Sequence, residues 1–436
     1  MNIQIQAKDK ISKKELNLPW TIIMAYFLCC FAVYLFGPWK YAYSVDWRTF
    51  LLIISFCVIA TIGYKSGIKS YFKNTSVNNA KDRNISTKIL QLFILISFVA
   101  VCCMLIIKIS QNGLSKTGNI FATMAQAYST TRSEEAHKDQ AIQIFYRTAF
   151  FFYFSIAVGL YNYKMLSKFY RLLLVLSIFT LSLYTVLYSG QQKQIGDIVI
   201  LVISVAITKY KPTPINILSK KKIIFTVLVM LVIILFSGIL SGRLVMMNMS
   251  LHGSASQHYY LNGDSIIFKI MPETAALGFS YFLFYISNGF YGLNLCLQQP
   301  FVWTKGLGSC SVIVTILKQY TKINPWNIPT YPRRTEFATG WSSSSVWHTI
   351  FPWLASDLTF PGAIILLAIG AYIYGKCWCE IKYQNKWQSI FMFSILNIQW
   401  FYMVANNQIF TAKSTFIVFI LGLFFWLTRN VKIRVK

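Results

Sequence analysis

The chain has 436 residues, of which 56% are hydrophobic and only 12% are charged, and its net charge is +28. That composition is typical of an integral membrane protein and excludes an ordinary soluble enzyme. A positive charge of this size could indicate nucleic-acid binding, but the basic residues cluster at the ends of apolar segments. We therefore interpret the charge as a signal of membrane topology and of contact with anionic lipid, and expect no nucleic-acid partner.

Ten apolar segments are predicted to cross the membrane as helices, because each can span a hydrocarbon core about 30 Å thick, the shorter ones with local thinning. They are residues 20–36, 49–63, 89–107, 148–163, 172–188, 194–208, 223–240, 358–375, 387–405 and 414–428. No small-residue cleavage site follows the first segment, which is therefore predicted to be a signal anchor. The expected fold class is an all-α polytopic membrane protein.

The basic residues assign a side of the membrane to each connection. With a cytoplasmic N-terminus, the inside segments carry most of the 41 Lys and Arg, although the outside segments contain roughly twice as many residues. This pattern predicts that both termini are cytoplasmic. It divides the chain into a membrane bundle of residues 1–240, an outer stretch of residues 241–357 and a second bundle of residues 358–436.

The outer stretch, residues 241–357, is long for a connection in a polytopic protein, and connections of such length are usually functional. A second outer loop covers residues 108–147. Residues 275–297 are apolar and long enough to cross the membrane, but a single crossing there would place the basic C-terminal tail outside. We expect this segment to form helices that lie at the interface or re-enter it.

Three arginines in the outer segments are candidates for substrate binding or catalysis. Arg243 directly follows the segment 223–240. It could anchor that helix end by snorkelling, or it could clamp a phosphate, because a guanidinium donates two hydrogen bonds in a fixed fork. Arg132 and Arg147, in the second outer loop, are further candidates for substrate binding.

The motif YPRRTEF brings two arginines and a carboxylate together among aromatic residues. It contains Tyr331, Arg333, Arg334 and Glu336, and Trp341 follows closely. The charged residues could form a solvated ion pair at the surface, which would contribute little. Alternatively, they could belong to a sugar-binding cleft, because sugar C–H faces stack on rings while hydroxyls bond to charged groups.

A polar segment leading into the eighth predicted span contains Trp347, His348 and Asp357. His348 could be a hydrogen-bonded histidine at the interface, or a general base suited to neutral pH. Asp357 could cap the next helix or orient the imidazole. Cys296 and Cys310 lie in the outer stretch and could form a disulfide in an oxidising compartment.

The sequence contains no motif for a metal or a cofactor. Neither phosphate-loop pattern occurs, no D-x-D stands at a loop, and no Cys/His set has zinc spacing. We therefore expect neither a metal site nor a cofactor.

Three stretches carry a resemblance to a known family: GRLVMM, which contains Arg243, GFSYFLFYISNGFYGL, and TGWSSSSVWHTIFPWLASDLTFPGAIIL. Together with the long outer stretch before the last spans, they resemble the O-antigen polymerases of the Wzy type and the related O-antigen ligases. His348 loosely matches a histidine of the ligases. Many relatives carry an arginine after a Ser-Gly turn between two central spans. Here that turn reads YSGQQKQIGD, so Lys193 or the glutamines occupy the region.

The resemblance implies a GT-C-like arrangement of helices and metal-independent transfer of a glycan from undecaprenyl diphosphate to a lipid-linked repeat unit, outside the bacterial inner membrane. It implies Arg243 on the leaving diphosphate, Arg333 and Arg334 on a second diphosphate or on sugars, and His348 or Asp357 as the base or its orienting group. A chain-length regulator is an implied partner. The alternatives are an O-antigen ligase, with lipid A-core as acceptor, and a flippase for lipid-linked oligosaccharides.

Overall fold

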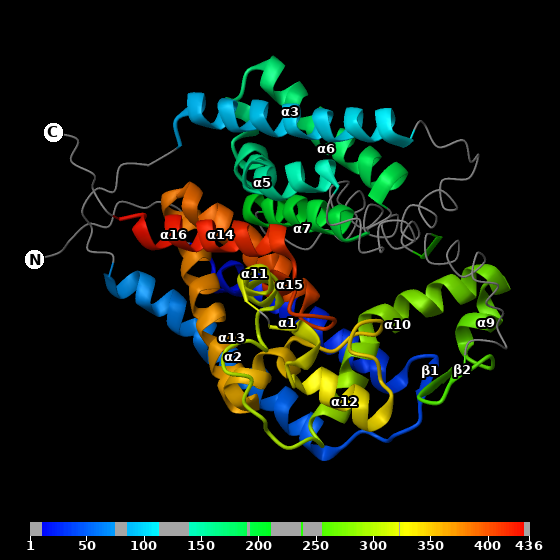
Figure 1. Cartoon of the computed structure of the whole chain (residues 1–436). Helices are drawn as coiled ribbons and strands as arrows, with labels where there is room; N and C mark the ends of the chain where they lie inside the picture. The colour runs from blue at the N-terminus through cyan, green and yellow to red at the C-terminus, as the bar shows by residue number, and fades with distance from the viewer. Residues whose placement is uncertain are drawn as a thin grey trace, which may run out of the picture.

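The computed structural model describes residues 11–74, 85–112, 139–189, 192–210, 237–238, 255–321 and 323–430. Most of the predicted span 223–240, Arg132 and Arg243 lie outside these residues. Nine long helices coincide with the other nine predicted spans (Figure 1). They are α1 Lys13–Phe36, α2 Trp47–Asn74, α3 Thr87–Asn112, α5 Gln140–Phe154, α6 Lys168–Tyr184, α7 Gln192–Lys209, α13 Ile350–Gln384, α14 Trp387–Tyr402 and α16 Lys413–Thr428.

Six helical segments of the described chain are long and apolar enough to cross a membrane. They are α1, α13, and the segments Trp47–Lys73, Thr87–Gln111, Gln140–Gly159 and Lys168–Ser189, of which the last two include short π-helical turns after α5 and α6. Of the remaining predicted spans, α16 is apolar but has only 16 residues. The chain is therefore a mostly helical, multi-pass membrane protein.

Two apolar cores fill the molecule, and α14 separates them. Helices α1, α2 and α13 pack around the first core, while α3, α5, α6 and α7 pack around the second. Every residue of α14 from Gln388 to Trp400 is buried. Ile390 and Phe393 contribute to the first core, whereas Phe391 and Ile395 contribute to the second. In Figure 1, α14 and α16 accordingly lie between the two groups of helices.

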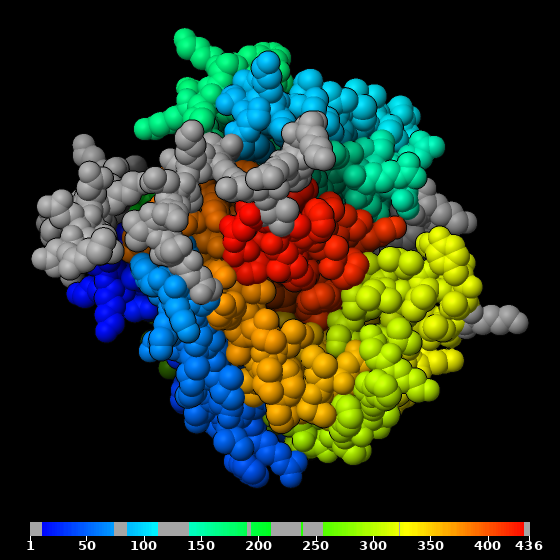
Figure 2. All heavy atoms as spheres, turned by 90° about the vertical axis from the view of Figure 1, so that its left-hand side faces the viewer, coloured from blue at the N-terminus to red at the C-terminus, as the bar shows by residue number. Residues whose placement is uncertain are grey.

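Helices α2 and α13 lie side by side, as the blue and orange segments of Figure 2 show, and their backbones approach closely at two glycines of α2. A Cβ atom added to Gly63 would lie 2.3 Å from the Ala368 carbonyl oxygen, and one added to Gly67 would lie 2.1 Å from that of Tyr372. The two glycines stand one turn apart in the sequence GYKSG, so they share one helix face. Small residues at this spacing let helix backbones approach closely in membranes.

A small three-stranded sheet joins the α1–α2 connection to the outer stretch, within a fold that is otherwise all-α as predicted. Its strands are β1 Trp39–Tyr41, β2 Ala255–Ser256 and β3 Tyr259–Leu261, in the order β1-β3-β2, with Lys40 opposite Tyr260. The strands are too short and too far apart in sequence to give an alternating pattern that could be recognised.

The remaining helices of the outer stretch are α9 Ile266–Ile270, α10 Glu273–Cys296, α11 Ser311–Tyr320 and α12 Tyr331–Thr339. The segment 275–297 forms the single helix α10. The Trp39 indole donates to the Ser280 carbonyl over 2.6 Å, and the Asn294 amide donates to the Ser44 carbonyl over 3.0 Å. Both halves of α10 are thus held to the same α1–α2 connection, and its predicted position at the membrane interface stays a prediction. Cys296 and Cys310 are free thiols, so the possible disulfide is absent.

Segments predicted to share a side of the membrane lie at the same end of the bundle, while the side that each end faces stays a prediction. Glu15 pairs with Lys382 over 2.8 Å, Tyr161 bonds to Asn385 over 2.7 Å, and Lys386 bonds to Asn430 over 2.8 Å. All of these residues belong to segments predicted inside or to the adjoining helix ends. The segments predicted outside meet at the other end of the bundle, where they surround a cavity.

Candidate functional site

Asp357 fastens a turn of the outer stretch to α13. Its carboxylate accepts hydrogen bonds from the Thr304 hydroxyl, from the Gly306 N–H over 2.8 Å and from the Ser309 N–H over 2.7 Å. Lys305 and Gly306 both have positive φ angles of 57° and 80° in this turn. A carboxylate with three donors already in place has a positioning function here, and none of its contacts is to His348.

His348 is packed inside the protein, with only 1% of its surface exposed. Its ring lies 6.3 Å from that of Trp353, and neither ring nitrogen makes a hydrogen bond of normal geometry to a described residue. Burial lowers the pKa of His348 to about 3, against an opposing contribution from the Val346 backbone. The imidazole is therefore neutral at pH 7.

The two arginines of α12 stack on aromatic rings. The Arg333 guanidinium lies 4.8 Å from the centre of the Trp326 ring, and that of Arg334 lies 4.6 Å from the Tyr331 ring. Arg334 also donates to the Pro300 carbonyl over 2.6 Å. Burial lowers the pKa of Arg333, while the charge of Glu336 opposes that shift. Aromatic residues and cations are thus brought together here, as the motif predicted.

The other predicted residues are dispersed. Glu336 accepts from the Ser343 hydroxyl over 2.6 Å, and Trp347 packs edge-on against Tyr285. Trp341 is buried, and its ring centre lies 5.6 Å from that of His258. His258 did not stand out in the sequence, because no acidic or cysteine neighbour marks it. Arg147 is exposed on α5.

A cavity of about 360 Å³ lies where five segments meet: α5, the turn after α6, the start of α7, α11 and the start of α16. We call it the lysine pocket, because Lys193 of α7 and Lys413 of α16 both line it. Its polar lining also includes Gln143, Ser189, Gln194 and Gln319. All of these segments belong to, or border on, regions predicted outside, and α11 comes from the outer stretch itself.

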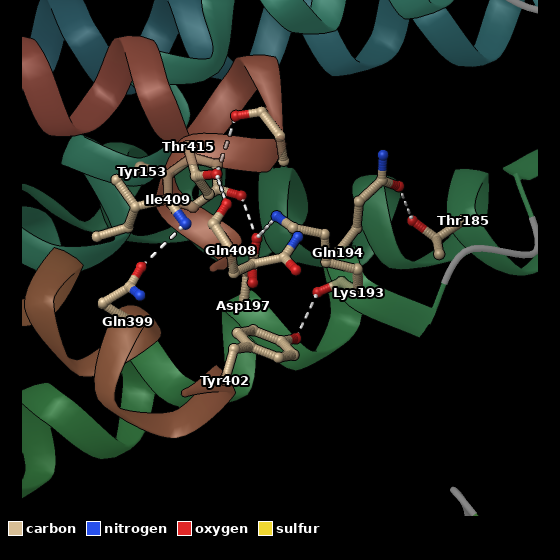
Figure 3. Close-up of polar contacts among 11 residues, drawn as sticks. Tyr153, Thr185, Lys193, Gln194, Asp197, Gln399, Tyr402, Gln408, Ile409 and Thr415 are labelled. Atoms are coloured by element: carbon tan, nitrogen blue, oxygen red, sulfur yellow. Dashed lines mark hydrogen bonds and ion pairs between the residues drawn. The ribbon is translucent and has the colours of Figure 1, made fainter. Parts of the chain in front are cut away.

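Lys193 is paired with a buried carboxylate one helical turn further along α7 (Figure 3). Its ammonium group lies 2.6 Å from Oδ2 of Asp197, which is only 2% exposed. The same oxygen accepts a hydrogen bond from the Tyr153 hydroxyl of α5. Oδ1 of Asp197 has no hydrogen-bond partner among the described residues, although the Tyr402 hydroxyl lies within electrostatic reach.

Lys413 supplies a second cation from the first turn of α16. Its ammonium group lies 5.5 Å from the centre of the Tyr146 ring, a cation–π contact. No carboxylate of the described part of the chain pairs with it. The lysine pocket therefore contains two ammonium groups and one adjacent carboxylate.

The break between α14 and α16 places Lys413 at the pocket. The Gln399 side chain of α14 accepts from the Ile409 N–H over 3.0 Å, and the Thr415 hydroxyl donates to the Gln408 carbonyl over 2.9 Å. On the opposite wall the Thr185 hydroxyl donates to the Gln194 side chain over 2.8 Å. These bonds, shown in Figure 3, fix the helix ends that carry the two lysines.

Chemically, this arrangement can bind an anion. Two ammonium groups next to amide and hydroxyl groups suit the oxygens of a phosphate or diphosphate. The sequence offered one signal for this site, the turn YSGQQKQIGD, and none for Lys413. The described residues contain no group of three His, Cys, Asp or Glu side chains placed to hold a metal ion. No family model, curated protein or solved structure matches this chain.

Proposed function

We propose that this chain is a glycosyltransferase that joins lipid-linked oligosaccharide repeat units, and that the lysine pocket holds the diphosphate of the polyprenyl carrier. The observation that carries the proposal is the position of Lys193 and Lys413. They come from distant parts of the sequence and line one cavity at the end of the bundle predicted to face outward. A carrier lipid would present its diphosphate at that depth.

Electrostatic stabilisation of the leaving diphosphate is the chemistry such a site would provide. Negative charge develops on the diphosphate as its bond to the anomeric carbon breaks, and positioned cations lower the energy of that transition state. The sugar is already activated by the diphosphate, which agrees with a sequence that has no nucleotide-binding motif. Arg243 remains a predicted third cation and lies outside the described residues.

The finer topology belongs to the same proposal. Ten spans, cytoplasmic termini and a GT-C-like arrangement in a bacterial inner membrane would put the lysine pocket on the periplasmic side. The aromatic residues and arginines of α12 would then offer a surface for the glycan. A regulator of chain length is a proposed partner.

Two other functions, an O-antigen ligase and a flippase, are alternatives to this proposal. An O-antigen ligase would bind the same carrier diphosphate but pass the glycan to lipid A-core. A flippase would need charged residues along a path through the bundle. Lys193 and Asp197 are placed near one end of α7 only, which favours the transferase.

The test is the lipopolysaccharide banding pattern of a strain that lacks the gene, complemented with wild type, Lys193→Gln, Lys413→Gln or Arg243→Ala. Loss of the ladder with core plus one repeat unit remaining is expected of a polymerase. Loss of all capped species, with accumulation of long lipid-linked polymer, would indicate a ligase. Loss of all capped species, with only unpolymerised lipid-linked units inside the cell, would indicate a flippase. Lys382→Gln, at the other end of the bundle, is the control and should retain the ladder.

A further inference from the structure

We propose that Asp197 competes with the bound diphosphate for Lys193, and so limits how tightly the lysine pocket holds its ligand. This inference rests on the proposed function, since it assumes that a diphosphate enters the pocket. Asp197 is a positioning residue in this scheme, because it acts through Lys193.

The geometry gives Lys193 two alternative anions. Its ammonium group is within 2.6 Å of Asp197, yet its side chain is 22% exposed and lines the cavity. A lysine has a flexible four-carbon stem, so rotation can carry the ammonium group from the carboxylate to a ligand in the cavity. Lys193 can therefore exchange one partner for the other.

Asp197 keeps one hydrogen bond when the ammonium group of Lys193 moves away from it. The Tyr153 hydroxyl still donates to Oδ2, and the Tyr402 hydroxyl lies close by. A buried carboxylate without any partner would be strongly disfavoured. With one hydrogen bond retained, the separated state is accessible but higher in energy, and that difference opposes binding of the ligand.

Lys413 has no such competitor among the described residues. The two lysines are therefore unequal: Lys413 contributes its full attraction to the ligand, whereas Lys193 contributes only the excess over its pairing with Asp197. A polymerase must release a carrier diphosphate after every transfer, and a pocket with two uncompensated cations would retain it. Return of Lys193 to Asp197 favours release.

Isothermal titration of the full-length protein in phosphatidylcholine nanodiscs tests the competition, with inorganic diphosphate and geranylgeranyl diphosphate as probes. Asp197→Asn removes the competing charge but keeps an acceptor for Tyr153. We expect it to tighten diphosphate binding on the order of tenfold, which corresponds to about 1.4 kcal/mol. Weaker or unchanged binding by Asp197→Asn would overturn the inference.

Tyr153→Phe is a second variant, for which the competition predicts the opposite change in diphosphate affinity. Without the hydroxyl, Asp197 depends more on Lys193, so diphosphate binding should weaken by several-fold; tighter or unchanged binding would contradict the competition. Glu15→Gln is the matched control, because it removes the carboxylate of a lysine pair at the other end of the bundle. It should leave binding unchanged.

Failure of the inference and failure of the proposed function give different results. If neither probe binds the wild-type protein, or if binding does not depend on Lys193 and Lys413, the assignment of the pocket itself is wrong. If both probes bind and Asp197→Asn has no effect, only the competition is wrong. A response confined to nanodiscs that contain phosphatidylglycerol would identify a phospholipid head group and overturn the assignment of diphosphate.

Discussion

Two buried carboxylates lie near the two ends of α16 and have different surroundings. Glu380 accepts hydrogen bonds from Arg429 over 2.8 Å, from the Trp426 indole over 3.1 Å and from the Ser389 hydroxyl. Asp197, near Lys413, has one oxygen with two partners and one with none among the described residues. Both carboxylate oxygens of Glu380 therefore accept hydrogen bonds, whereas only one oxygen of Asp197 does so among the described residues.

Under the proposed function, the two ends have different tasks. A carboxylate whose oxygens are fully bonded can only hold helices together, and Glu380 joins α13, α14 and α16. A carboxylate that shares an exchangeable lysine with a cavity can respond to a ligand. The first and last of the four predictions below test this division, and the other two test the burial of His348 and the kink in α13. The expected change in stability decreases from the first prediction to the last.

Glu380→Gln should destabilise the protein by about 3–5 kcal/mol, because it removes the buried carboxylate charge that pairs with the guanidinium of Arg429. The measurement is denaturant-induced unfolding in detergent, compared with Asp197→Asn. The double variant Glu380→Leu with Arg429→Met should recover much of the loss. A loss for Glu380→Gln no larger than that for Asp197→Asn would break the comparison.

His348 should make the protein sensitive to acid. Its folded pKa of about 3 lies below the ordinary value of 6.5, so the unfolded chain binds the proton more readily. The contribution of neutral His348 to the free energy of unfolding is present above pH 6.5 and is lost as the pH falls toward 3. The loss is about 2 kcal/mol at pH 5. Unfolding of His348→Gln measured from pH 5 to 7.5 should show a weaker pH dependence than wild type, and an identical slope would contradict this account.

Thr359→Gly should stabilise the protein, although glycine usually destabilises a helix. Thr359 has φ 62° and ψ 167° at the kink in α13, a conformation that is essentially restricted to glycine. Relief of this strain, less the entropy cost of glycine, should raise the free energy of unfolding by about 1 kcal/mol. Thr349→Gly, outside the kink, is the control and should give no gain. A loss of stability for Thr359→Gly would show that the kink in α13 does not store strain at this residue.

Lys413→Gln should change stability by less than about 0.5 kcal/mol, because no described carboxylate pairs with Lys413. Its effect on polymer formation should nevertheless be a loss of tenfold or more, corresponding to at least about 1.4 kcal/mol in the transition state. Unfolding and banding measured on the same variant separate the two effects. A large loss of stability would mean that Lys413 belongs to the structural framework.

The sequence by itself determined where the described helices lie and which of their ends lie together. Apolar runs and basic flanks are local properties, so nine of the ten predicted spans coincide with helices, and the ends predicted together do meet. The turn YSGQQKQIGD also drew attention to the region of Lys193, because the family that the chain resembles often carries an arginine there.

Only the tertiary structure decided which of the candidate residues share a site. Lys193 and Lys413 line one cavity, Asp357 is fully engaged with the turn at Thr304, and His348 is buried. The sheet, the contact of Gly67 with Tyr372 and the two surroundings of the carboxylates also depend on residues far apart in the chain. Such facts follow from how helix faces pack against one another, and the pattern along one helix fixes its apolar face but not its neighbour.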